Sequence, residues 1–172
     1  MKNSLSYGLE KREHFAGIYD GGNHIIKNLS FSGASSSDNV DVGLFRTLKN
    51  GAEIKNLTLQ SSNALSGIRE RGGLLAGSAS GTIKLTNVGI EGSLGTNGSD
   101  KYGSNLGGLI GYVKDANLSI EGVNLNITII NAYKHIGGLI GWLENSTLSV
   151  KKVYTPNFEI NIYADGYAGG FV

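Results

Sequence analysis

The chain has 172 residues, enough for one domain with a continuous core, and its 40% apolar residues and single proline exclude a collagen-like or typical disordered chain. Its net charge of +1, from 15 basic and 14 acidic residues, provides no field for a polyanion, so nucleic acid is not expected as a partner. Cysteine is absent, which removes disulfides, thiolate chemistry and cysteine-ligated metal sites.

The N-terminal residues 1–14 are interpreted as a flank outside the repeats. They contain no apolar core of a signal peptide, and no run of about 18 apolar residues occurs in the chain. No membrane insertion by this segment is therefore expected. If the parent protein is exported, its targeting signals are expected outside this chain.

The first predicted element runs from Phe15 to Phe31. It contains the turn sequence Asp20-Gly21-Gly22-Asn23 between two apolar stretches, as expected for short strands joined by a turn. Its second half, Ile26 to Phe31, matches Ile54 to Leu59 almost residue for residue. This segment is therefore interpreted as a divergent first copy of a repeat that starts near residue 15.

Clearer copies follow, each opening on a glycine and two apolar residues. The opening glycines are 30, 35, 30 and 32 residues apart, and a second apolar strand follows each of the first four. The copies start near residues 43, 73, 108 and 138, with an incomplete coil from residue 170. Residues alternate within these strands, and no window shows helical spacing. We predict one domain over residues 1–172: an all-β parallel β-helix of about five coils of roughly 30 residues, with loops of variable length.

Equivalent positions of successive coils lie above one another in such a solenoid, which predicts interior columns and a ladder. A repeated glycine indicates either a positive φ or a place with no room for a Cβ. The repeat glycines are Gly43, Gly73, Gly108, Gly111, Gly138, Gly141 and Gly170. One predicted interior column is Leu44, Leu74, Leu109, Leu139 and Phe171, and a second is Ile26, Ile54, Ile83, Leu118 and Leu148. Asn28, Asn56 and Asn87 are predicted to form an amide ladder that stops where Gly122 and Lys152 take their place.

Two copies carry a complete Gly-Leu-apolar-Gly quartet, Gly108 to Gly111 and Gly138 to Gly141. With these quartets the chain, from about residue 15 to 172, resembles the GLUG-motif repeat family of bacterial surface adhesins and of non-catalytic regions of IgA-cleaving metallopeptidases. The resemblance implies a secreted or cell-surface module with no catalytic residue and no cofactor. It also implies a host glycan, a host or bacterial surface protein, or further repeats of the parent chain as partners.

Tyr112 and Trp142 directly follow the two quartets and are the candidate contacts for a ligand or partner. They should stack one coil apart, where aromatic faces bind a sugar ring or a protein, although packing beneath a loop is the alternative.

No catalytic or metal site is predicted, because the three histidines are isolated and the aspartates fall in predicted turns. Those aspartates are Asp20, Asp38, Asp41, Asp100 and Asp165. The predicted function is a non-catalytic structural or adhesive module of an exported bacterial surface protein. The alternative is a carbohydrate-binding or polysaccharide-degrading β-helix.

Overall fold

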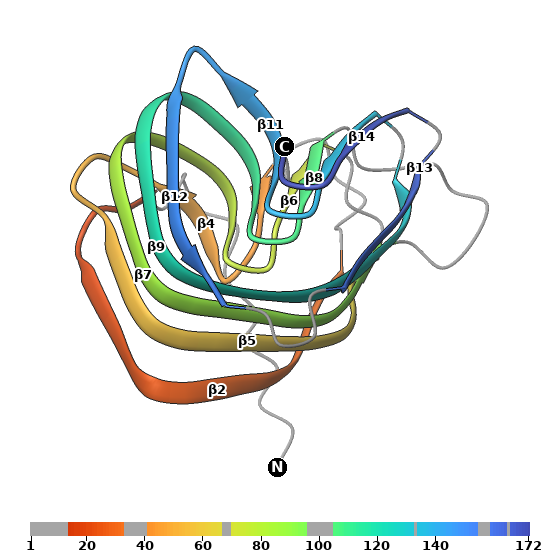
Figure 1. Cartoon of the computed structure of the whole chain (residues 1–172), viewed down its shortest axis with the longest axis horizontal. Helices are drawn as coiled ribbons and strands as arrows, with labels where there is room; N and C mark the ends of the chain where they lie inside the picture. The colour runs from red at the N-terminus through yellow and green to blue at the C-terminus, as the bar shows by residue number, and fades with distance from the viewer. Residues whose placement is uncertain are drawn as a thin grey trace.

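The computed structural model describes residues 14–32, 41–66, 70–95, 105–132, 134–154, 159–164 and 166–172. These residues form strands that follow one another in parallel coils (Figure 1). The strands are β1 (His14–Phe15), β2 (Ile18–Ser32), β3 (Asp41–Val42), β4 (Phe45–Leu48), β5 (Glu53–Ser66), β6 (Arg71–Gly72), β7 (Ala76–Gly95), β8 (Asn105–Gly107), β9 (Ile110–Ala132), β10 (His135–Gly137), β11 (Ile140–Glu144), β12 (Thr147–Val153), β13 (Glu159–Ala164) and β14 (Tyr167–Gly169). Among the described residues, no helix is long and apolar enough to cross a membrane.

Every strand pair given for the described residues is parallel, and the pairs build two sheets. The long strands β2, β5, β7 and β9 stack as nested arcs, with β12 and β13 continuing the stack (Figure 1). Inside the arcs lies the second, five-stranded sheet in the order β14-β10-β8-β6-β3, with one strand before each opening glycine. The prediction of a parallel β-helix is confirmed, and the pairing of β2 with β5 confirms that Phe15 to Phe31 belongs to a first coil.

The first predicted column is confirmed in its middle and wrong at its last member. Leu74, Leu109 and Leu139 are fully buried, and their backbones hydrogen-bond from coil to coil. Leu44 is half-buried and packs against this core. Phe171 is 43% exposed, because it lies in the last coil with no described strand packed beyond it.

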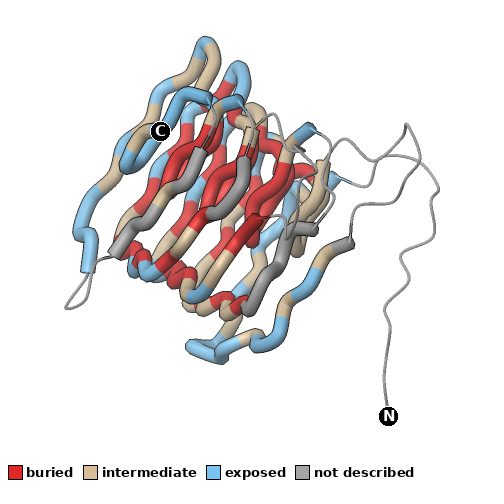
Figure 2. Tube along the Cα trace, turned by 90° about the vertical axis from the view of Figure 1, so that its right-hand side faces the viewer, coloured by how far each residue is buried: buried red, intermediate tan, exposed pale blue. Residues whose placement is uncertain are grey.

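The second predicted column is correct for Ile83, Leu118 and Leu148 and wrong for Ile26 and Ile54. Ile54 pairs with Leu85, and Ile26 pairs with Leu59. The observed columns are Tyr19-Ile54-Leu85-Ile120-Val150 and Ile26-Leu59-Ile90-Leu125. All these residues belong to the core or pack against it, which confirms the predicted interior place of Ile26 and Ile54, and the buried positions concentrate in the middle coils (Figure 2).

The corner of each arc is formed by a residue in the left-handed region. Asn56 and Asn87 have φ values of 54° and 52°, and the amide of Asn87 donates to Oδ1 of Asn56 at 3.2 Å. The predicted ladder is wrong at Asn28, since the amide of Asn56 donates instead to Oδ1 of Asp20 at 3.1 Å. Gly122 and Lys152 follow in the same place with φ values of 73° and 55°, so the ladder stops there as predicted.

The repeat glycines, all of them among the described residues, have no positive φ. At Gly43, Gly73 and Gly108 a Cβ would collide with backbone atoms of the next coil. At Gly111 and Gly141 it would collide with backbone atoms of the preceding coil. Of the two predicted reasons for glycine, the lack of room is therefore the correct one at these five positions. At Gly170 a Cβ would meet nothing within 4 Å, so the requirement is absent there.

Candidate binding face

Two columns of side chains lie next to each other where the five-stranded sheet meets the beginning of the long strands. One column, on β4, β7, β9 and β11, is Thr47-Ser78-Tyr112-Trp142. The other, on the five-stranded sheet, is Asp41-Arg71-Asn105-His135-Tyr167. The columns are polar in the first coils and aromatic in the last ones. We call Tyr112, Trp142, His135 and Tyr167 the aromatic face.

The structure brings the predicted pair together, since Trp142 is the direct partner of Tyr112 on the next coil. Their ring centroids are 6.5 Å apart and their planes are perpendicular, so the two rings form an edge-to-face contact and no flat platform. Their role as ligand contacts stays a prediction.

Tyr112 is held on several sides. Its hydroxyl donates to Oε2 of Glu144 at 2.5 Å, and Nζ of Lys114 lies 2.7 Å from the other oxygen of that carboxylate. The guanidinium of Arg71 lies over its ring, 5.2 Å from the centroid. Burial raises the pKa of Tyr112, and the bond to Glu144 raises it further, so its hydroxyl stays protonated. Tyr112 is therefore a half-buried side chain in a fixed position that supports Trp142.

Trp142 is 37% exposed and contacts a second ring, His135, at a centroid distance of 3.8 Å and an angle of 68°. Nδ1 of His135 donates to Oδ1 of Asn105 at 2.9 Å, which fixes the orientation of the imidazole. Tyr167 lies parallel to His135 at 5.7 Å and is 79% exposed. The three rings therefore occupy defined positions at the surface.

A cavity of about 240 Å³ opens between these rings. It lies where β10 and β14 meet β11. Its lining consists of His135, Ile136, Gly141, Trp142, Leu143, Tyr167, Ala168, Gly169 and Val172. No lining side chain is a carboxylate, a lysine or an arginine, and Val172, the last residue of the sequence, is part of the lining.

The polar end of the two columns forms a small network. Thr47 and Ser78 share a buried hydrogen bond of 3.1 Å between their hydroxyls, and Nε of Arg71 lies 3.1 Å from Oδ1 of Asp41. Burial raises the pKa of Asp41, although the charge of Arg71 opposes this effect. Asp41 lies in strand β3, so its predicted place in a turn is wrong.

The other predicted turn aspartates do not assemble an acidic site in the described part of the chain. Asp20 lies at the corner of β2 and bonds to Asn56 and to the backbone N–H of Gly22. Asp38, Asp100 and Asp165 fall outside the described residues. Within the described ranges, no three histidines or acidic residues are grouped so that they hold a metal ion.

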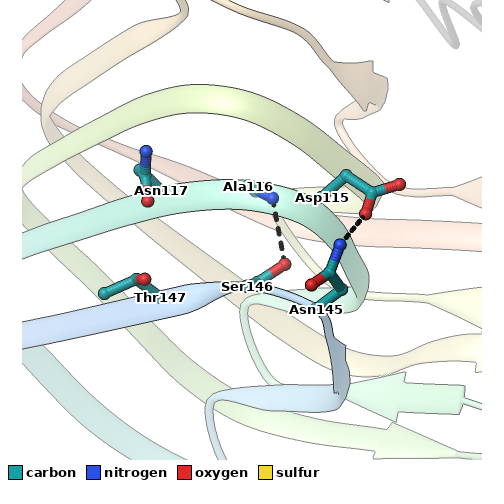
Figure 3. A pocket seen from close by; sticks show the side chains of 6 residues that line it. All are labelled: Asp115, Ala116, Asn117, Asn145, Ser146 and Thr147. Carbon is teal, nitrogen blue, oxygen red and sulfur yellow. Dashed lines mark hydrogen bonds between the residues drawn. The ribbon is translucent and has the colours of Figure 1, made fainter.

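A second, wider hollow of about 640 Å³ lies between β9 and β12, at the corner that begins three residues after Tyr112 and Trp142 (Figure 3). It is lined by Asp115, Ala116, Asn117, Asn145, Ser146 and Thr147. The amide of Asn145 donates to Asp115, and the hydroxyl of Ser146 accepts from the N–H of Ala116 (Figure 3). Asp115 and Asn145 both have left-handed φ values, of 49° and 45°. These side chains therefore join two stacked corners.

His135 and Tyr167 were not predicted from the sequence as members of the face. A signal was present, because Asn105, His135 and Tyr167 each stand three residues before an opening glycine of the repeat. Aligning the copies on that glycine places these residues in one column.

The comparisons with known proteins give one partial similarity. No family model matches the chain, and no solved structure matches it. The chain is 36% identical over 101 residues to halomucin of Haloquadratum walsbyi. The match covers 58% of this chain and 1% of halomucin, so the chain spans only a small fraction of the curated relative that it matches.

Proposed function

We propose that this chain is a non-catalytic structural module of an exported bacterial surface protein, which spaces and presents a binding surface. The observation that carries the proposal is the use of the carboxylates. In the described residues, the carboxylates that form ion pairs or bonds to other side chains have partners about 30 residues away in the sequence. Each such contact therefore joins two neighbouring coils. The carboxylate ties are Asp20–Lys55, Asp41–Arg71, Glu53–Lys84, Glu91–Gln60, Asp115–Asn145, Glu121–Lys152 and Glu144–Lys114.

The proposed mechanism is geometric. Stacked strands are separated by about 4.8 Å, so the five strands of the inner sheet span about 19 Å. Each added coil lengthens the stack by the same step and repeats the outer columns. The GLUG-type quartets and the similarity to part of halomucin support an exported parent protein in which further repeats of this type are neighbours of the module.

The spacing role is tested by small-angle scattering on the chain and on a fusion of two copies. If coils continue from one copy to the next, the fusion is a single rod about 24 Å longer than one copy. Two separate beads joined by a mobile linker contradict this spacing role.

The surface location is tested by an antibody raised against the folded chain. We expect it to label intact cells of the source organism. Labelling that appears only after the cells are broken contradicts an exported surface protein.

A further inference from the structure

The turn between β4 and β5 contains a chemically reactive dipeptide, Asn50-Gly51. Both residues are exposed to solvent, and Gly51 has a φ of 92°. An asparagine that precedes glycine deamidates more readily than one that precedes a larger residue, because glycine has no side chain to keep its nitrogen away from the asparagine amide. The turn therefore combines a susceptible sequence with access to water.

Both reacting groups of this dipeptide are bonded to the next coil. The N–H of Gly51 donates to the carbonyl oxygen of Thr82, in β7, at 2.9 Å. The N–H of Thr82 in turn donates to Oδ1 of Asn50 at 3.0 Å. The backbone nitrogen that would attack and the side chain that it would attack are thus held by one residue of the neighbouring coil.

The turn is also fixed by its flanking residues. The N–H of Lys49 donates to the carbonyl oxygen of Phe15 at 2.8 Å, and its Nζ donates to Oγ of Ser80 at 2.9 Å. The next coil approaches so closely that a Cβ at Gly81 would lie 2.7 Å from Cβ of Asn50. Described coils therefore pack on both sides of the turn.

Deamidation at this place would proceed in two steps. The nitrogen of Gly51 loses its proton and attacks Cγ of Asn50, so that a new N–C bond closes a five-membered succinimide while the side-chain amide nitrogen leaves as ammonia. Water then adds to one of the two ring carbonyls and opens the ring to aspartate or to isoaspartate. The first step needs the nitrogen of Gly51 and the side chain of Asn50 to be released from Thr82.

From the two bonds to Thr82, we propose that Asn50 is a deamidation site that is protected while its turn is stacked on β7 and is modified when the two coils separate. Aspartate keeps an oxygen that accepts from Thr82. Isoaspartate lengthens the backbone by one atom between Asn50 and Gly51, which breaks the register of the turn. Its formation therefore makes the separation of the coils permanent. This inference does not rest on the proposed function.

The test compares the whole chain in mildly alkaline buffer with the same chain in enough urea to unfold it. Mass spectrometry of peptides measures deamidation at Asn50 and separates it from the other Asn-Gly pair of the sequence, Asn97-Gly98. We expect Asn50 to react at least about tenfold more slowly in the folded chain, in proportion to the hydrogen-exchange protection of the Gly51 N–H. Equal rates in the folded and the unfolded chain overturn the proposal.

A pair of variants tests the role of stacking. Gly81→Ala places a Cβ against Asn50 at a φ of 81° and should raise the deamidation rate of the folded chain about tenfold. The matched control is Gly122→Ala, which strains a corner of β9 at a φ of 73° and should leave the rate at Asn50 unchanged. Circular dichroism verifies that both variants keep the fold. An unchanged rate in folded Gly81→Ala, or equal acceleration in both variants, overturns the proposal.

Two measurements on the unaltered sequence do not depend on how these variants fold. If Gly81→Ala is unfolded, the comparison of deamidation with hydrogen exchange at Gly51 decides the outcome. The isoaspartate form is also separated by chromatography, and its Gly51 N–H should exchange at least about tenfold faster than before. Full protection of that N–H in the isoaspartate form contradicts a permanent separation of the coils.

Discussion

Asn56 and Asn87 each perform two tasks at a corner. Their backbones adopt a left-handed φ that costs most side chains about 1–2 kcal/mol, and asparagine is one of the few residues that tolerate it. Their amides meanwhile hydrogen-bond from coil to coil and end on the carboxylate of Asp20. In the next coil Gly122 keeps the backbone shape and gives up the bond.

The two tasks can be separated at Asn87. Both Asn87→Gly and Asn87→Ala lose the side-chain bond, but glycine adopts the left-handed φ without strain, whereas alanine lacks the tolerance of asparagine for it. We expect the alanine variant to be about 1 kcal/mol less stable than the glycine variant, measured by urea unfolding. Equal losses in the two variants would mean that the hydrogen bond alone determines the stability of this corner.

The close approach of coils at the opening glycines leads us to predict a loss of stability when one of these glycines is replaced. A Cβ at Gly108 would collide with the carbonyl oxygen of Gly138, which belongs to the backbone and has no free rotation. Gly108→Ala should therefore lower the free energy of unfolding by about 3 kcal/mol, seen in thermal denaturation. Gly170→Ala is the matched control because open space surrounds Gly170, and a large loss there would contradict this account.

At the scale of elements, ion pairs tie β2 to β5, β5 to β7, and β9 to β11 and β12. The bond from Lys114 lowers the pKa of Glu144, and the bond from the Tyr112 hydroxyl lowers it further. A carboxyl whose pKa is lowered in the fold stabilises it above its ordinary pKa, and this stabilisation is lost as the pH falls through the folded value. The same holds for Glu121, whose pKa is lowered by the bond from Lys152.

Glu144→Gln removes this acid-sensitive contribution. The urea midpoint of the variant should change less than that of the unaltered chain between about pH 5 and about pH 3. Glu121→Gln should behave in the same way, because its tie joins the same two coils. An unchanged slope in both variants would show that these exposed ties do not contribute to acid stability.

Elements also show how far the sequence predicts the fold. The thirty-residue spacing fixes Trp142 above Tyr112, so that pairing follows from the repeat alone. The match of Ile26 with Ile54 misled because strand pairing follows the corners: Asp20 and its two glycines stack on the corner of Asn56, which shifts Ile26 to Leu59. The position of the corner therefore determines the strand register, even where two segments have nearly the same sequence.

Only part of the aromatic face, Tyr112 and Trp142, could be predicted from the repeat. His135 and Tyr167 lie on the inner sheet, and His135 reaches Trp142 because the chain bends at the opening glycine between β10 and β11. Local alternation describes each strand and contains no information on that bend. The three-dimensional stack was needed to join the two columns.

For the molecule as a whole, burial predicts an uneven stability along the stack. The core side chains of β7 and β9 are fully buried, whereas β2 exposes Ile18 and Ile25 (Figure 2). In a solenoid each coil is stabilised by its neighbours, so hydrogen exchange should be slowest in β7 and β9 and faster in β2 and β12. Equal protection in all coils would indicate one indivisible folding unit.

Because all described strand pairs are parallel, the two ends of the stack are chemically different surfaces. The side-chain amides add to this difference, since the N–H groups of Asn56 and Asn87 both point toward the first coil. Any contact that extends the stack in register must therefore join unlike ends, a heterologous arrangement that does not close on itself. The coil is thus a unit with a direction: assembly through its ends produces lines, and a two-fold dimer would have to use its sides.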